Sequence, residues 1–111
     1  MFKKILNRLR FRAFCKGYYS GVSKFQSIRS KSKEFRPYKV TARELDSYIS
    51  SSHYRMTDFR FAEWKTGFDL GFLDAVSYYN SDGQHGLNIL AAEIKSDKNR
   101  MRKTWNDILA S

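Results

Sequence analysis

The sequence contains few residues of several types, and each scarcity excludes a class of protein. A single cysteine, Cys15, excludes a framework of internal disulfides. The two histidines, His53 and His85, cannot with that cysteine supply the four ligands of a structural zinc site. One proline in 111 residues leaves long stretches free to form helix. We therefore expect a helical protein of a reducing compartment with no metal and no cofactor.

Long apolar runs are also absent. The run Ile89 to Ala92 is typical in length, so no segment is expected to span a bilayer. Charges interrupt the first dozen residues too often for a secretory signal, and the sequence predicts a cytoplasmic protein with no membrane partner. Residues 1–33 lack acids and are rich in Arg, Lys and Ser, a composition that is also typical of a mitochondrial transit peptide. That alternative stays open.

Catalytic patterns are missing too. The chain has no nucleophile, base and orienting group at recognisable spacing, and no glycine-rich phosphate loop, so we expect no enzyme activity and no small-molecule substrate. Cys15 next to Lys16 is the one reactive group to consider. It is either a thiol of lowered pKa or a small buried hydrophobe.

Charge is plentiful, but it is unevenly distributed. The formal net charge is +10. Residues 1–43 hold 13 Lys and Arg against the single acid Glu34, residues 44–94 hold three against eight, and residues 95–111 hold five against two. Because neutralising phosphates releases counterions, a basic segment of this kind favours binding to a polyanion. A nucleic acid is therefore the expected partner.

Apolar periodicity predicts helices separated by short connections. A basic amphipathic helix is expected from Lys3 to about Phe25, followed by a basic loop over residues 26–40. Thr41 and Glu44 have the spacing of a capping box, which predicts a short helix to about Ile49.

Two more helices are expected in the second half of the chain. The first begins at Thr57 or Asp58 and ends near Tyr79. A turn over residues 80–83 and a permissive Gly86 lead to one last helix over residues 87–109. The core stripe of the long helix is expected to be Phe61, Trp64, Phe68, Phe72 and Ala75.

Two glycine pairs form an internal repeat. Gly17 and Gly21 recur fifty positions later as Gly67 and Gly71, and an aromatic residue precedes each pair by three positions. Glycines inside helices cost about 0.5 to 1 kcal/mol each, so packing must offset that cost. Glycines four apart share one helix face and let two backbones approach closely. The alternative is that one glycine of each pair only ends its helix.

The resulting fold class is all-α, a small helical domain. Two glycine-faced helices cross, a short inserted helix lies between them in sequence, and a C-terminal helix completes the core. We expect a basic helical core over residues 1–80 and a helical extension over residues 81–111 that packs on the same domain.

Three segments resemble the ribosome modulation factor family. They are Ala13 to Val22 (Ala-Phe-Cys-Lys-Gly-Tyr-Tyr-Ser-Gly-Val), Ser32 to Tyr38 (Ser-Lys-Glu-Phe-Arg-Pro-Tyr) and Trp64 to Phe68 (Trp-Lys-Thr-Gly-Phe), in the order of the family. The chain departs from the family by an added segment between Tyr38 and Trp64 and by a longer C-terminus. The resemblance implies a small basic protein that binds the small ribosomal subunit, blocks initiation and promotes ribosome hibernation.

The candidate RNA-binding residues follow from the basic segment and its interleaved aromatic residues. Cations are expected to bind phosphates, and exposed aromatic rings to stack on unpaired bases. For Tyr18 and Tyr38 the favoured alternative is packing under the loop, because a domain this small needs its aromatic residues for the core. Two alternatives remain: a phage or mobile-element protein that inhibits a host protein through residues 87–109, and a DNA-binding helical module. The RNA-binding candidates are Arg8, Arg10, Arg12, Lys16, Tyr18, Lys24, Arg29, Lys31, Lys33, Arg36, Tyr38 and Lys39.

Overall fold

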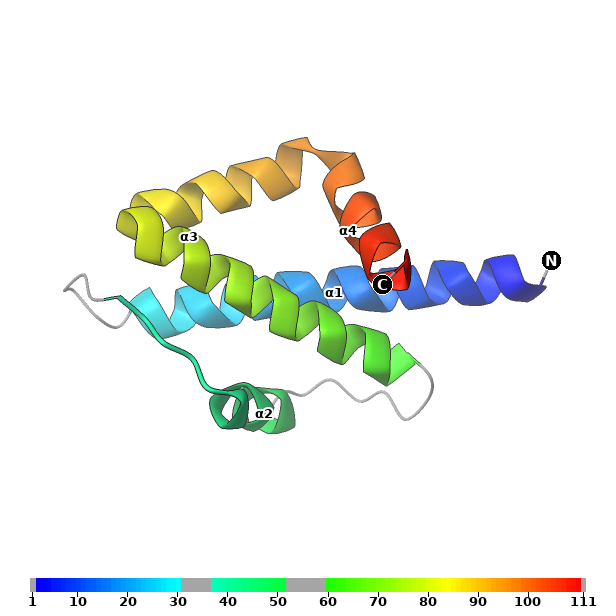
Figure 1. Ribbon diagram of the computed structural model, residues 1–111, viewed down its shortest axis with the longest axis horizontal. Coiled ribbons are helices and arrows are strands. Elements are labelled where there is room, and N and C mark those ends of the chain that lie inside the picture. The colour runs from blue at the N-terminus through cyan, green and yellow to red at the C-terminus, as the bar shows by residue number, and fades with distance from the viewer. Residues whose placement is uncertain (1, 31–36, 52–59, 111) are drawn as a thin grey trace.

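The computed structural model describes residues 2–30, 37–51 and 60–110, and all regular structure in them is α-helical. The helices are α1 (Phe2–Ser30), α2 (Ala42–Ser51), α3 (Arg60–Ser96) and α4 (Lys98–Ala110), as Figure 1 shows. The predicted all-α fold class is confirmed. None of the helices in the described part of the chain is long and apolar enough to cross a membrane.

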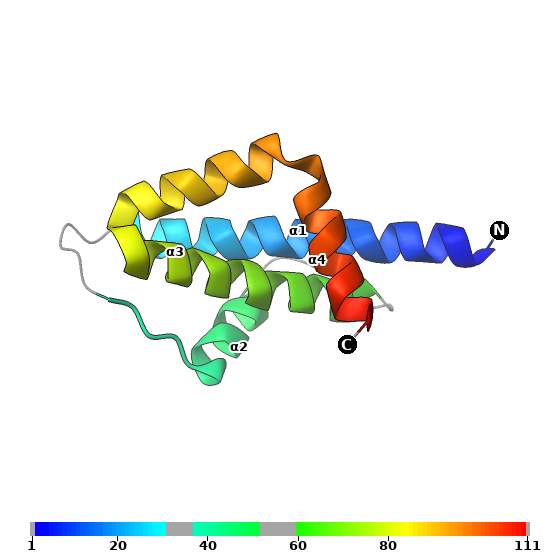
Figure 2. The ribbon, with the colours of Figure 1, turned by 45° about the horizontal axis from the view of Figure 1, so that its top comes forward.

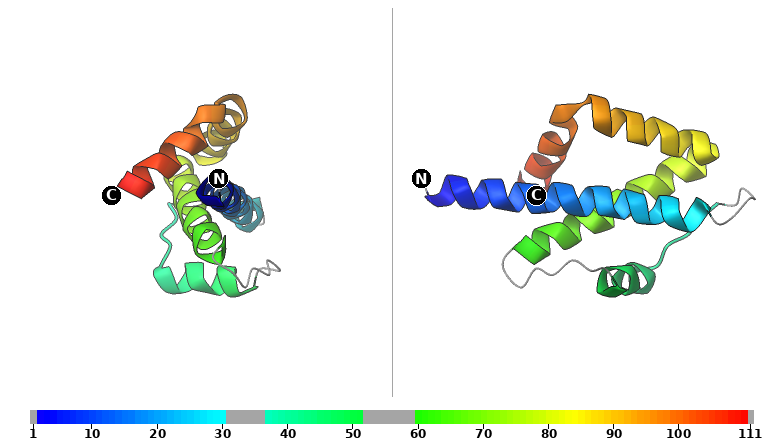
Figure 3. Two further views of the ribbon diagram at one scale, coloured as in Figure 1. Left: turned by 90° about the vertical axis from the view of Figure 1, so that its right-hand side faces the viewer. Right: turned by 180° about the vertical axis from the view of Figure 1, so that it is seen from behind.

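Helix α3 is bent into two arms that fold back on each other (Figures 1 and 2). The first arm, residues 60–81, crosses α1. The second arm, residues 84–96, runs back in the opposite direction to the first. The bend lies at Asp82 and Gly83, whose backbone angles are not helical. Gly83 has a φ of 60°, which glycine adopts without a steric penalty, so the predicted turn over residues 80–83 is confirmed. Helix α4 then turns across α1 (Figure 3).

The glycine repeat forms the crossing of α1 and α3. A Cβ atom added at Gly17 would lie 2.0 Å from the carbonyl oxygen of Trp64, and one at Gly67 would lie 2.1 Å from that of Phe14. The other two glycines are equally tight, with 2.2 Å at Gly21 and 2.1 Å at Gly71. The close packing predicted from the repeat is therefore confirmed, and the contacts are reciprocal.

Gly86 has a similar role, which the sequence did not predict. A Cβ atom there would lie 2.0 Å from the carbonyl oxygen of Tyr78, so the two arms of α3 also meet backbone to backbone. Its φ is not in the left-handed region, since Gly83 alone has a positive φ in the described chain. Gly86 is thus needed for close approach and not for conformational freedom.

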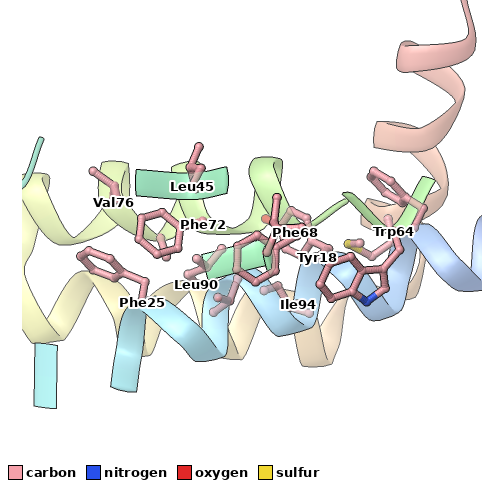
Figure 4. Close-up of a cluster of buried hydrophobic side chains, with 14 of the residues drawn as sticks. Tyr18, Phe25, Leu45, Trp64, Phe68, Phe72, Val76, Leu90 and Ile94 are labelled. Atoms are coloured by element: carbon pink, nitrogen blue, oxygen red, sulfur yellow. The ribbon is translucent and has the colours of Figure 1, made fainter. Parts of the chain in front are cut away.

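Aromatic side chains fill the space around the crossing (Figure 4). Phe25 is fully buried, with its ring centroid 5.4 Å from that of Phe72. Phe61 is a correction to the predicted core stripe, because it is 36% exposed one turn before the crossing begins. The largest fully buried side chains are Trp64, Tyr18, Phe14, Phe25, Phe72, Leu87 and Leu90.

Two predicted helix boundaries were wrong. Helix α1 continues through residues 26–30, which were expected to form a loop, because Ile28 packs against the core and the guanidinium of Arg29 lies 4.5 Å from the ring centroid of Tyr79. The predicted last helix is two elements. Asp97 interrupts it and caps α4, since its Oδ1 accepts a hydrogen bond from the backbone amide of Asn99 at 3.0 Å.

Helix α2 is capped as predicted, packs on the core through Leu45 and Ile49, and carries a carboxylate that binds two tyrosines. The Thr41 hydroxyl accepts from the amide of Glu44 at 3.1 Å. The Glu44 side chain accepts from Tyr38 at 2.5 Å and from Tyr48 at 2.7 Å. The hydrogen bond from Tyr38 is the main cause that lowers the pKa of Glu44. The cap predicted at Thr57 or Asp58 lies outside the described residues.

Asp69 provides a prediction about stability. Burial raises its pKa above the ordinary 3.8, and the nearby Lys65 only partly offsets this effect. Between the unfolded and the raised folded pKa the native state binds more protons, so stability falls as pH rises through that window. We expect Asp69→Asn to raise the thermal midpoint at neutral pH by up to about 5 °C, with no gain at a pH below both pKa values. A lower midpoint at neutral pH would contradict this assignment.

Candidate nucleic-acid interface

Three of the predicted cations lie along one face of α1. Arg8, Arg12 and Lys16 follow at intervals of four residues, so they stack on successive turns about 6 Å apart. All three are exposed, and none makes an ion pair with another described residue. No acid occurs within α1 to neutralise them. They form a continuous positive surface.

Lys4 extends this surface, although it was not among the predicted RNA-binding residues. It is exposed and lies four residues before Arg8, so the same interval that relates Arg8, Arg12 and Lys16 could have identified it. We call Lys4, Arg8, Arg12 and Lys16 the basic stripe. It covers about 18 Å of helix. The first turns of α1 extend beyond the other helices in Figures 1 and 2, which leaves this end of the stripe open to a large partner.

Arg10 does not belong to the stripe. It is two residues from both Arg8 and Arg12, which rotates it by about 200° around the helix axis. Its side chain is half-buried, and its Nε atom is shielded from solvent. The prediction treated all four α1 cations as one surface, and this was wrong for Arg10 because helix geometry puts it on another side.

The cations expected in the following segment are dispersed. The Lys24 ammonium lies 5.1 Å from the ring centroid of Tyr48, and Arg29 contacts the ring of Tyr79 and donates to its hydroxyl. Both therefore have partners in the fold. Lys39 is exposed, in the segment before α2 and not on α1. Lys31, Lys33 and Arg36 lie outside the described residues.

Of the two aromatic candidates, Tyr18 is buried and Tyr38 is half-buried. Tyr18 is 1% exposed and its hydroxyl donates to Asp74 at 2.5 Å, so it cannot stack on a base. Burial, followed by this hydrogen bond, raises the pKa of Tyr18. Tyr38 is half-buried, with its ring centroid 5.1 Å from that of Phe25 and its backbone amide donating to Asn80 at 2.7 Å. Both rings are used to hold the fold together.

Comparisons with protein-family models, curated proteins and solved structures found no match.

Helix α4 brings a further cation to the edge of the stripe. The guanidinium of Arg102 lies 4.0 Å from the ring centroid of Phe11 on α1, and the Arg102 side chain is exposed to solvent. It is also close to Cys15, where it partly offsets the burial that raises the pKa of that thiol. A thiol of lowered pKa was the wrong alternative for Cys15, because desolvation outweighs the nearby charge.

Proposed function

We propose that this protein binds RNA through the basic stripe, that its target is the RNA of the small ribosomal subunit, and that binding modulates or inhibits translation. The observation that carries the proposal is the stripe itself, with four exposed cations on one helix face and no acid in that helix. Cations held in a row by a rigid helix can contact successive phosphates without reading sequence.

The folded charge distribution favours a polyanion over an acidic protein surface. Two acids of the middle segment are paired within the fold: Glu93 pairs with Arg100 at 2.6 Å, and Asp46 lies 3.8 Å from Lys65. The stripe has no such partners among the described residues. Since counterions condensed on RNA are released when phosphates are neutralised, the stripe obtains most of its affinity from that release.

The ribosome is proposed as the source of the RNA because of the sequence resemblance. Two of the three resembling segments, Ala13 to Val22 and Trp64 to Phe68, meet at the glycine crossing. Because these segments pack on each other, their resemblance to the ribosome modulation factor family supports a common helical core. The stripe runs along the outer side of the same α1 helix, which would present it to the RNA.

The test is co-sedimentation with ribosomal subunits on a sucrose gradient over a series of salt concentrations. We expect the wild-type protein to migrate with the small subunit at low salt. The variant Arg8→Gln/Arg12→Gln/Lys16→Gln should bind at least about tenfold more weakly, and its slope of log K against log salt should be shallower by about 2 to 3. Circular dichroism checks that its helix content is unchanged.

The matched control removes three charges elsewhere. Arg43→Gln/Lys65→Gln/Lys95→Gln lowers the net charge equally but leaves the stripe intact, so it should stay with the subunit. If both triple variants dissociate equally, net charge alone drives binding and the basic stripe is not the RNA-binding surface. If the wild type stays at the top of the gradient yet binds purified RNA, the ribosomal target is wrong. If the stripe variant stays with the subunit at the same salt concentrations as the wild type, the proposal as a whole is contradicted.

A further inference from the structure

A hollow of about 350 Å³ lies between the N-terminal part of α1 and α4. Both helices contribute cations and a carboxamide, and α4 adds the apolar side chains. Pockets that hold small molecules begin at roughly 300 Å³, so the space suits a ligand of modest size. Its lining residues are Lys4, Asn7, Arg8, Arg102, Trp105, Asn106 and Leu109.

The charge of the hollow favours an anion. Lys4, Arg8 and Arg102 all line it, and none of its seven lining residues is acidic. Like charges gathered around a shared space repel one another, and a bound anion removes that repulsion. Two of these cations, Lys4 and Arg8, are also part of the basic stripe. A phosphate in the hollow would thus continue the row of phosphates along the stripe.

The wall formed by α4 is held in place before any ligand binds. Trp105 is 6% exposed, and its ring centroid lies 5.2 Å from that of Phe14. Arg102 is positioned by its contact with Phe11 at 4.0 Å. Because these contacts order the site in advance, little conformational entropy is lost when a ligand enters.

The remaining lining groups suit a nucleobase. Asn7 and Asn106 each carry an amide donor and a carbonyl acceptor, the combination that the edge of a base requires. Leu109 is 62% exposed and offers an apolar surface to a base or ribose. In a duplex these base edges are paired and stacked, whereas a single strand can turn one base outward.

From this arrangement we infer that the hollow between α1 and α4 is a binding site for one unstacked nucleotide of a single-stranded RNA segment. Lys4, Arg8 and Arg102 bind its phosphates, and Asn7 and Asn106 contact its base. The inference rests on the proposed function and extends it, since it gives the basic stripe a preference for single-stranded RNA. It also assigns a role in binding to α4.

The test compares a labelled single-stranded RNA of about ten nucleotides with a duplex of equal length, by fluorescence anisotropy at fixed salt. The variant Asn7→Ala/Asn106→Ala changes no charge. We expect it to bind the single strand about tenfold more weakly and the duplex as the wild type does, with an unchanged salt slope. The matched control Gln84→Ala/Asn88→Ala removes two exposed carboxamides from α3 and should bind both RNAs normally.

Nucleotide titrations followed by NMR supply a second readout. Ribonucleoside monophosphates should shift the side-chain amide signals of Asn7 and Asn106 more than inorganic phosphate does. If Asn7→Ala/Asn106→Ala binds the single strand as tightly as the wild type, the proposed nucleotide site is wrong. The site is also wrong if this variant binds single strand and duplex with equally weakened affinity. The stripe variant distinguishes the two proposals, because its weakened binding alongside an unaffected Asn variant leaves the proposed function standing. Failure of the wild type to bind either RNA overturns both.

Discussion

Gly67→Ala is expected to destabilise the protein by about 2 kcal/mol. The new Cβ would lie 2.1 Å from the carbonyl oxygen of Phe14, closer than real Cβ contacts occur. Backbone cannot move aside as a flexible side chain does, so α1 and α3 must separate and lose packing along the crossing. Overpacking commonly costs about 1 to 3 kcal/mol, and the gain of about 1 kcal/mol in helix propensity does not compensate here.

Urea unfolding followed by circular dichroism measures this effect. The double variant Gly17→Ala/Gly67→Ala places a methyl group on both sides of the crossing and should lose the cooperative transition, since total stabilities of about 5 to 15 kcal/mol leave little reserve. Ser23→Ala is the matched control, because it adds no bulk at an exposed position of α1. A Gly67→Ala midpoint at or above that of the wild type would show that helix propensity dominates and that the backbones are not in contact.

Trp105→Ala should detach α4 from α1 at a cost of about 3 to 5 kcal/mol. The indole packs against Phe14 at 5.2 Å and Phe11 at 6.5 Å between ring centroids, and it is the largest side chain that α4 buries. Its loss leaves Met101 and the half-buried Ile108 as the apolar contacts of that helix. A helix of 13 residues is marginal without tertiary packing, so α4 is expected to unfold locally.

Amide hydrogen exchange locates the effect of Trp105→Ala. Protection should fall along α4 and persist in α1 and the first arm of α3, because the glycine crossing does not involve α4. Trp105→Phe keeps an aromatic ring in place and should retain most of the protection. If α4 amides remain protected in Trp105→Ala, other contacts hold this helix and the indole is not its anchor.

Local signals in the sequence predicted the elements with a strong chemical pattern. Thr41 caps α2 as expected, and α3 bends at Gly83, within the turn that was predicted over residues 80–83. The glycine repeat predicted a crossing because glycines in helix interiors need a compensating contact, and the structure shows that contact at Gly17 and Gly67. The signal for the break at Asp97 was also present, since Asp is a favoured capping residue, but the apolar spacing on either side of it concealed the break.

The candidate interface was only partly predictable. Charge counting found the basic helix, and helical spacing separates the stripe of Arg8, Arg12 and Lys16 from Arg10. Residue type alone could not show that Tyr18 is buried, because a tyrosine suits a core and a surface equally well. Nor could it show that Arg102 lies over Phe11, since the two are far apart in sequence and only the docking of α4 brings them together.

The sequence by itself therefore determined the all-α class, the basic character of α1 and the close crossing at the glycines, because the signal for each is contained within one or two helical turns. Tertiary structure decided which tyrosines are buried, how far α1 extends, and that α1 and α4 enclose a basic hollow. Those features arise from contacts between distant segments, and their energies depend on how whole helices pack and not on the propensity of any single residue.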